Sequence, residues 1–147
     1  KGKAAHDELL RLIDEDTNAF NRIVAAWNLP DASPDEKAAK NAAIQAATKE
    51  AILVPLRAME VALAAMDVCR AMAEIGNPAS VSDAGVGAMA CRSAVLGAFL
   101  NVKINASGVE DKAWLAEVLS RGTRLQEQAV ALERQILDLV NQKIAAA

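Results

Sequence analysis

The segment from Gly76 to Asn105 constrains the fold more than any other part of the chain. It opens with Gly76-Asn77-Pro78, a combination that ends one helix. Ser80 or Ser82 can then accept hydrogen bonds from the free backbone N–H groups that begin the next helix. A new helix therefore starts here and runs to Asn105.

The two long faces of this helix differ in size and polarity. At 100° per residue, small and polar side chains fall along one line and bulkier ones lie behind them. The line forms a shallow groove with a carboxylate at one end and amides at the other: Asp83, Gly87, Ala90, Ala94, Gly97, Asn101 and Asn105. Small-residue faces usually receive a neighbouring helix at close range. The polar ends make a ligand site the alternative.

Composition favours an all-helical protein. The chain has 147 residues, enough for one domain with a real core, and 53% of them are hydrophobic. Aromatic residues make up only 3% and alanine is abundant, which favours closely packed helices over a β-sandwich. No segment alternates as a strand does, so we expect an all-α bundle of long antiparallel helices.

Charge and cysteine content narrow the functional classes. A net charge of -3, with two Trp, two Phe and no Tyr, argues against nucleic-acid binding, which needs a basic face and stacking rings. Two cysteines and no visible secretory signal favour a reducing, cytoplasmic location. The run from Ala84 to Val102 is long enough to span a membrane, but Arg92 lies in its middle and it is rich in Ala and Gly. We interpret it as a buried central helix and expect no membrane contact.

The first predicted helix, from about Ala4 to Asn28, places an acid on its apolar stripe. The stripe repeats at three- and four-residue spacing: Leu9, Leu12, Ile13, Asp16, Phe20, Ile23 and Trp27. Desolvation among apolar neighbours raises the pKa of a carboxyl group, so an inward Asp16 must be hydrogen-bonded or share a proton. Such an acid suits general acid–base catalysis. The alternative is a structural Asp16 paired with Lys, Arg or a backbone donor.

The second predicted helix has a strong start signal and an internal proline. Ser33-Pro34-Asp35-Glu36 combines an N-cap, a proline at N1 and a glutamate at N3, and the helix extends to about Ile75. Pro55 lies on its inner face, where it kinks the helix and leaves the Ala51 carbonyl without its usual partner. Thr48, about one turn before Ala51, can face the interior beside the Ala51 carbonyl. Its hydroxyl then either contacts a ligand or only satisfies a nearby backbone carbonyl.

The last predicted helix follows a turn at Asn105-Ala106-Ser107-Gly108. Its apolar positions alternate at three- and four-residue steps from Leu115 to Leu139. It covers roughly 35 residues, or about 50 Å at 1.5 Å per residue. That exceeds what a compact domain of this size needs, so we expect the excess to pack on another subunit of at least a dimer.

Familiar catalytic patterns are absent or accidental. His6 is the only histidine and lies in a polar N-terminus, so a His-based metal site or triad is not available. Gly85-Val86-Gly87-Ala88-Met89-Ala90 has the letters of a dinucleotide fingerprint, but no strand precedes it. The acids show no compact spacing such as an EF-hand loop, so we predict no metal ion.

Four groups of residues together resemble the formiminotetrahydrofolate cyclodeaminase and methenyltetrahydrofolate cyclohydrolase family. They occur in the family's order and spacing and cover most of the chain from Leu9 to Leu119. The groups are Glu15-Asp16-Thr17-Asn18-Ala19-Phe20-Asn21 with Leu29-Pro30; Ile44-Gln45-Ala46-Ala47-Thr48 before Val54-Pro55-Leu56; Gly76-Asn77-Pro78 with Val81-Ser82-Asp83-Ala84-Gly85-Val86; and Leu100-Asn101-Val102-Lys103-Ile104-Asn105.

The resemblance implies an all-helical homodimer with a folate site near the subunit interface. In cyclodeaminases of this family, N10 of 5-formimino-tetrahydrofolate attacks the formimino carbon and ammonia leaves, giving 5,10-methenyltetrahydrofolate. Relatives hydrolyse the methenyl group, and a formiminotransferase is an implied partner. The family's proton-accepting aspartate falls on Asp16, in agreement with its place on the apolar stripe. From the positions of the residues around the helices and from the motifs together, we expect these side chains to contact the folate: Asp83, Asn77, Asn101, Asn105 and Thr48.

One part of the family pattern does not match. Members begin with a Pro/Gly-rich segment, which does not appear before Lys1, and with a basic stretch often ending in Tyr, a residue this chain lacks. We therefore expect a single cyclodeaminase-like domain over residues 1–147 without that N-terminal segment. A cyclodeaminase is the leading interpretation. A cyclohydrolase, or a helical oligomer that kept the fold without the chemistry, is the alternative.

Overall fold

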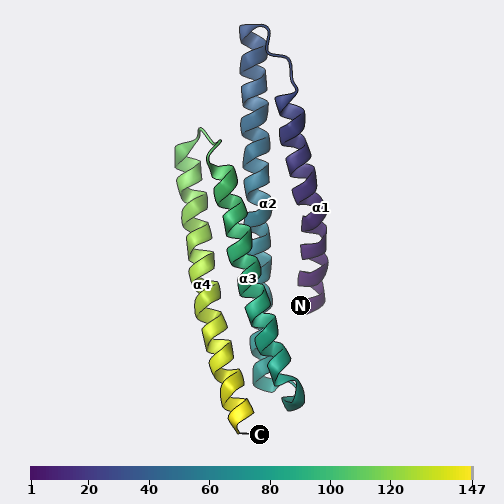
Figure 1. Cartoon of the computed structure of the whole chain (residues 1–147), viewed down its shortest axis with the longest axis vertical. Coiled ribbons are helices and arrows are strands. Elements are labelled where there is room, and N and C mark those ends of the chain that lie inside the picture. Colours follow the sequence, from purple (N-terminus) through teal and green to yellow (C-terminus); the bar gives the residue numbers. More distant parts are fainter. Residues whose placement is uncertain (147) are drawn as a thin grey trace.

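The computed structural model describes residues 1–146, which form an all-α fold of four long helices (Figure 1). Successive helices run antiparallel and make a long, narrow bundle. The fold class predicted from the sequence is confirmed, and the helix ends lie within a few residues of the predicted ones. The helices are α1 (Gly2–Trp27), α2 (Pro34–Ile75), α3 (Val81–Ala106) and α4 (Lys112–Ala145), with a short 3-10 helix, η1, at Pro78–Ser80.

Local side chains set where two of the helices begin. At the start of α2, Ser33 Oγ accepts from the Glu36 N–H at 3.2 Å, and the Glu36 carboxylate accepts from the Ser33 N–H at 2.8 Å. This is the predicted capping box. At the start of α4, Asp111 accepts from the Trp114 N–H at 3.1 Å. Pro55 lies inside α2, which continues on both sides of it.

The main core lies between α2, α3 and α4. Its fully buried side chains come from all three helices: Ile52, Met59, Met66, Val95, Val102 and Ile136. Helix α4 packs on both α3 and α2, and Lys143 near its end donates to the Glu74 carbonyl near the end of α2. The length of α4 is therefore accounted for inside the chain, which removes the reason for expecting its end to pack on another subunit.

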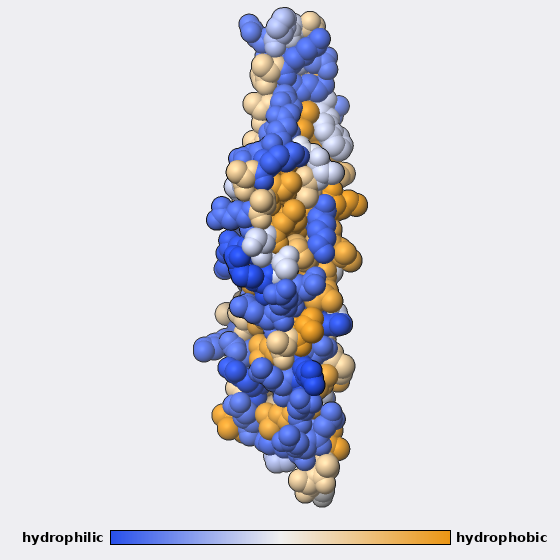
Figure 2. Space-filling model, turned by 90° about the vertical axis from the view of Figure 1, so that its left-hand side faces the viewer, coloured by the Kyte–Doolittle hydropathy of each residue, from blue (hydrophilic) through white to orange (hydrophobic). Residues whose placement is uncertain are grey.

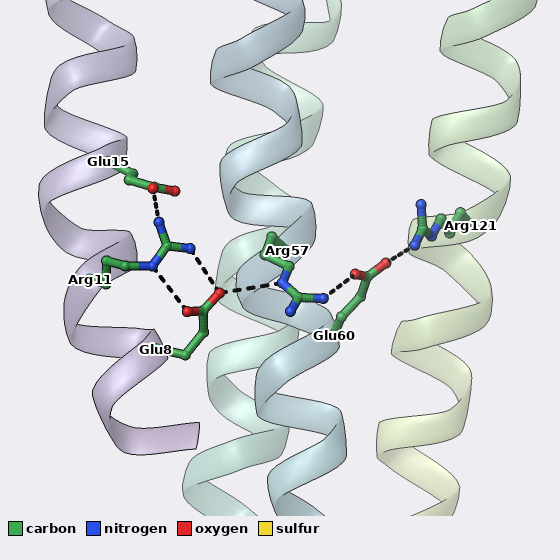
Figure 3. A network of polar contacts seen from close by, with 6 residues as sticks. All are labelled: Glu8, Arg11, Glu15, Arg57, Glu60 and Arg121. Atoms are coloured by element: carbon green, nitrogen blue, oxygen red, sulfur yellow. Dashed lines mark hydrogen bonds and ion pairs between the residues drawn. The ribbon is translucent and has the colours of Figure 1, made fainter. Parts of the chain in front are cut away.

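Helix α1 packs chiefly on α2. Their contact forms a second, smaller apolar cluster from Ala19 and Ile23 of α1 with Ala47 and Ala51 of α2. A network of ion pairs also joins three helices (Figure 3). It comprises Glu15, Arg11 and Glu8 of α1, Arg57 and Glu60 of α2, and Arg121 of α4. Since partly exposed pairs of this kind contribute at most about 1 kcal/mol each, α1 depends mainly on its contact with one neighbour.

Helix α3 is strongly apolar but is covered over only part of its surface. The stretch Pro78–Ala106 is long and apolar enough to cross a membrane by length and composition alone, yet only 28% of its most apolar window is buried. Leu100 and Ile104 are 66% and 73% exposed. Figure 2, which views the molecule from the α4 side, shows hydrophobic residues among hydrophilic ones on that face as well. The predicted burial of this helix holds where it packs on α2 and α4 and is wrong for the rest of it.

Candidate functional site

A groove of about 510 Å³ lies between α1 and α3, with α2 beneath it. Its polar lining includes Asp16 on the α1 wall and Asn101 on the α3 wall. Gly97, one turn before Asn101, has no side chain, and a Cβ placed there would meet no atom within 4 Å. The groove is therefore open beside this position of α3. An apolar bed with a few convergent polar groups is the usual character of a small-molecule site. The apolar lining comes from all three helices and includes Leu9, Leu12, Ile13, Val54, Pro55, Ala58 and Ala98.

Asp16 faces this groove without a partner of its own. Its side chain is half-buried, and within residues 1–146 no hydrogen bond or ion pair holds its carboxylate. The paired, structural Asp16 considered as an alternative is therefore not found in this part of the chain. The predicted surroundings differ in one respect, because Ile13 and Phe20 are 62% and 58% exposed rather than buried. Within residues 1–146 no other helix covers Ile13 and Phe20 on that flank of α1, so Asp16 lies at the edge of the apolar stripe.

The proline in α2 shapes the contact at one end of the groove. Pro55 frees the Ala51 carbonyl, as predicted, and the Asn105 carboxamide of α3 donates to it at 3.2 Å. The same Asn105 nitrogen lies 3.4 Å from Asn101 Oδ1. Of the two α3 amides predicted to bind substrate, only Asn101 lines the groove, while Asn105 is part of the contact between α2 and α3.

Asp83 and Asn77 line a different cavity, of about 360 Å³, where α2 joins α3. Asn77 Oδ1 accepts from the Ala79 N–H at 3.1 Å and so caps η1, whereas the Ser80 side chain, predicted as a possible cap of the long helix, forms no cap hydrogen bond. Asp83 precedes Asn101 by eighteen residues of α3, or about 27 Å at 1.5 Å per residue. Within one chain, the predicted groove is therefore two separate cavities, and Asp83 is not near Asp16.

Thr48 lies outside both cavities. It is 7% exposed, and its methyl group would be 3.8 Å from a Cβ at Gly108, in the turn between α3 and α4. This turn is fastened to α2 by a side chain that the sequence interpretation did not assign. Gln45 donates to the Gly108 carbonyl at 2.8 Å and accepts from the Glu110 N–H at 2.9 Å.

Gln45 belongs to a row of polar side chains on one face of α2. Asn41 donates to the Glu110 carboxylate at 3.2 Å, and Lys49 pairs with Asp111 at 2.8 Å. The four-residue spacing of Asn41, Gln45 and Lys49 is the signal that could have identified this row from the sequence. The row fastens the turn between α3 and α4 to α2.

The two cysteines are free, half-buried thiols between α2 and α3. Burial, followed by the neighbouring Cys69 thiol, raises the pKa of Cys91 to about 11. Cys91 is therefore protonated at neutral pH and is a poor nucleophile. Among the side chains of residues 1–146, no group of three His, Cys, Asp or Glu residues is arranged to hold a metal ion.

The structure is thus a long antiparallel helical bundle with an acid in an open groove. The profile of the formiminotransferase-cyclodeaminase family matches residues 1–124, and the chain belongs to this family. It is 35% identical over 144 residues to the methenyltetrahydrofolate cyclohydrolase of Methylorubrum extorquens, a match that covers 98% of this chain and 69% of that protein.

Two further relatives support the family and the fold. The formimidoyltransferase-cyclodeaminase of Sus scrofa is 35% identical over 135 residues, which cover 92% of this chain but only 25% of the longer pig protein. The crystal structure of formiminotetrahydrofolate cyclodeaminase from Thermotoga maritima superimposes with a TM-score of 0.81, over 97% of this chain and 67% of that chain. At 22% identity, the latter likeness concerns the fold alone.

Proposed function

We propose that this protein converts 5-formimino-tetrahydrofolate to 5,10-methenyltetrahydrofolate with release of ammonia. Family membership and the cyclodeaminase names of its relatives support this reaction. The observation that carries it is the Asp16 carboxylate, which has no partner in the described chain and lies in a groove whose other wall bears Asn101. The volume and the apolar bed of the groove suit a flat ring system such as a pterin.

The reaction needs a group that accepts a proton and returns it. N10 loses its proton as its bond to the formimino carbon forms, and the nitrogen that departs must gain one to leave as ammonia. Asp16 accepts the first proton and donates it to the leaving nitrogen, an assistance typically worth about 100- to 10,000-fold. Asn101 donates to an acceptor of the folate and helps to hold N5 and N10 in the ring-closing geometry.

Hydrolysis of the methenyl group is the second candidate. The 35% identity to the Methylorubrum cyclohydrolase, along 98% of this chain, favours it. In this reaction water attacks the methenyl carbon and Asp16 takes one proton of that water. The bond from the carbon to N5 then breaks as Asp16 gives this proton to N5, and the second proton of the water is released as the formyl C=O forms. The product is 10-formyltetrahydrofolate. The same groove and the same acid serve both reactions.

We also propose that a second copy of the chain completes the site. Leu100 and Ile104 are exposed beside Asn101, and a partner subunit that covers them also covers the groove. Position 92 is midway between Asp83 and Asn101, so antiparallel α3 helices that cross near this position on a two-fold axis place Asp83 of the partner subunit beside Asn101. The two cavities of one chain then become the two ends of one shared site.

Substrate supply and location follow from the same proposal. The pig relative is a formimidoyltransferase-cyclodeaminase, and it is much longer than this chain. We propose that a formiminotransferase supplies the formimino compound to this protein in the cytoplasm.

The test is an assay of both substrates with the variant Asp16→Asn. We expect wild type to produce methenyl absorbance and free ammonia from 5-formimino-tetrahydrofolate. Asp16→Asn should lower turnover by at least about 100-fold and change the free energy of unfolding by less than about 1 kcal/mol, because no partner is lost. Asp14→Asn, which alters an exposed acid outside the groove, is the matched control and should keep full activity.

Three results would contradict parts of this proposal. Wild type that acts on neither substrate contradicts the enzyme function. If the protein consumes the methenyl substrate but releases no ammonia from the formimino compound, its reaction is hydrolysis and not cyclisation. Full activity of Asp16→Asn removes Asp16 from the mechanism.

A further inference from the structure

We propose that Asn105 is a positioning residue, which uses the carbonyl freed by Pro55 to orient the Asn101 carboxamide toward the ligand in the groove. This inference rests on the proposed folate site but concerns a different residue. The sequence had suggested that Asn105 contacts the substrate itself, whereas the structure places its amide between two helices.

The first step is the contact with α2. A backbone carbonyl can only accept hydrogen bonds, so the Asn105 side chain must present its NH2 group to the Ala51 oxygen, 3.2 Å away. Any residue other than proline at position 55 would bring an N–H of its own to that carbonyl. The proline therefore makes the Ala51 carbonyl available to α3, in a part-buried contact.

The second step is the contact with Asn101. The Asn105 NH2 group has two hydrogens, and the one not used on Ala51 is available to Asn101 Oδ1, 3.4 Å away on the next turn of α3. Because this contact takes the oxygen of Asn101, the NH2 group of Asn101 is left to donate elsewhere. Within residues 1–146 that NH2 group has no protein partner, and Asn101 lines the groove opposite Asp16. The ligand group it suits is a hydrogen-bond acceptor, such as a ring carbonyl or an imine nitrogen.

A double-mutant cycle separates positioning from direct contact. We expect Asn101→Ala and Asn105→Ala each to lower kcat/KM by about tenfold, the equivalent of one hydrogen bond. If Asn105 acts through Asn101, the double variant should be no worse than Asn101→Ala alone, and Asn105→Ala should mainly change the same kinetic constant, kcat or KM, as Asn101→Ala does. Asn105→Asp, which keeps the shape but loses the NH2 group, should behave like Asn105→Ala.

A matched control accounts for loss of stability. Asn41→Ala also removes an asparagine amide that links two elements, here α2 and the turn before α4, but it lies outside the groove. It should keep the kcat/KM of wild type. Losses that multiply to about 100-fold in the double variant, or full activity of Asn105→Ala, would overturn the positioning role.

A spectroscopic measurement keeps this inference testable if the proposed reaction is wrong. In 15N-labelled protein without ligand, the side-chain NH2 signals of Asn101 should shift in Asn105→Ala and stay in place in Asn41→Ala. Asn101 signals that are the same in wild type and Asn105→Ala contradict the inference whatever the protein catalyses. Inactive wild type with shifted Asn101 signals contradicts only the proposed function.

Discussion

Gly97 determines how deep the groove is on the α3 side. A Cβ at this position would meet no atom within 4 Å, so a larger side chain can enter the groove without disturbing the core. We expect Gly97→Leu to fold as wild type does and to weaken binding of the folate substrate at least about tenfold, because the new side chain occupies space that the ligand needs. Titration of the folate, followed by the fluorescence of Trp27 and Trp114 or by calorimetry, measures the change.

Gly97→Ala is the matched control for this prediction. It adds only one methyl group and should raise helix stability by up to about 1 kcal/mol, with a smaller effect on binding. Sedimentation of both variants checks that assembly is unchanged. Equal folate affinity of wild type and Gly97→Leu would show that the ligand binds elsewhere.

At the scale of single residues, the sequence predicted the helix face on which a residue lies better than it predicted which side chains surround that residue. The spacing of the apolar stripe placed Asp16 on the inward side of α1, and the structure agrees. It did not predict that Ile13 and Phe20 would be exposed, because a stripe does not reveal which of its residues a neighbouring helix covers. The freed Ala51 carbonyl was predicted from Pro55, but its partner Asn105 is 54 residues away and could not be.

At the scale of secondary-structure elements, Gln45 fastens the turn between α3 and α4 to α2. Gln45→Ala removes two hydrogen bonds to the backbone of that turn. We expect it to lower the free energy of unfolding by about 1 to 2 kcal/mol, measured by urea denaturation. Gln128→Ala, on the exposed surface of α4, should change the free energy of unfolding by less than about 0.5 kcal/mol. Equal effects of the two substitutions would mean that the turn does not depend on Gln45.

The ion pairs of Figure 3 make the attachment of α1 dependent on pH. The Arg11 guanidinium, hydrogen-bonded to Glu8, lowers the pKa of Glu8 below its ordinary value of 4.5. Because the folded pKa is the lower one, this contact stabilises the fold above pH 4.5 and is lost as the pH falls through the folded value. We expect the melting temperature of wild type to fall slightly more between pH 7 and pH 3 than that of Glu8→Gln.

Two comparisons check this assignment. The difference between wild type and Glu8→Gln should shrink in high salt, since exposed pairs are screened. Parallel melting curves for the two proteins at every pH would show that Glu8 adds nothing to stability.

The beginnings of the helices were predictable to different degrees. The capping box at Ser33 and Glu36 is local, and four consecutive residues were enough to identify it. The start of α3 was harder, because Asn77 caps the short η1 turn and the Ser80 side chain forms no cap hydrogen bond. Gly-Pro-rich joints allow several turn geometries, and spacing along the chain does not choose among them.

At the scale of the whole molecule, the uncovered face of α3 predicts self-association. Leu100→Lys places a charge on that face without altering the core, so we expect wild type to sediment as a dimer and Leu100→Lys as a monomer. Val130→Lys, at an exposed apolar position of α4, is the control and should remain dimeric. A wild-type monomer at micromolar concentration would contradict the shared site.

Four antiparallel helices could be predicted from the sequence because breaking and capping residues mark their ends and short connections join them, while α1 and α4 also show a clear apolar periodicity. The relation between Asp16, Asp83 and Asn101 could not, because it depends on which helices are neighbours. At 100° per residue, Asp83 and Asn101 fall on one line of the helix, but this projection does not reveal that only the Asn101 end of the line faces α1.

The packing of α1 on a single neighbour has a mechanical consequence for the groove. The Asn101 wall belongs to a helix that packs on both α2 and α4, whereas the Asp16 wall belongs to a helix that packs chiefly on α2. We therefore expect the Asp16 wall to yield more easily than the Asn101 wall, so that a bulky ligand displaces the acid-bearing side further than the side with the carboxamide.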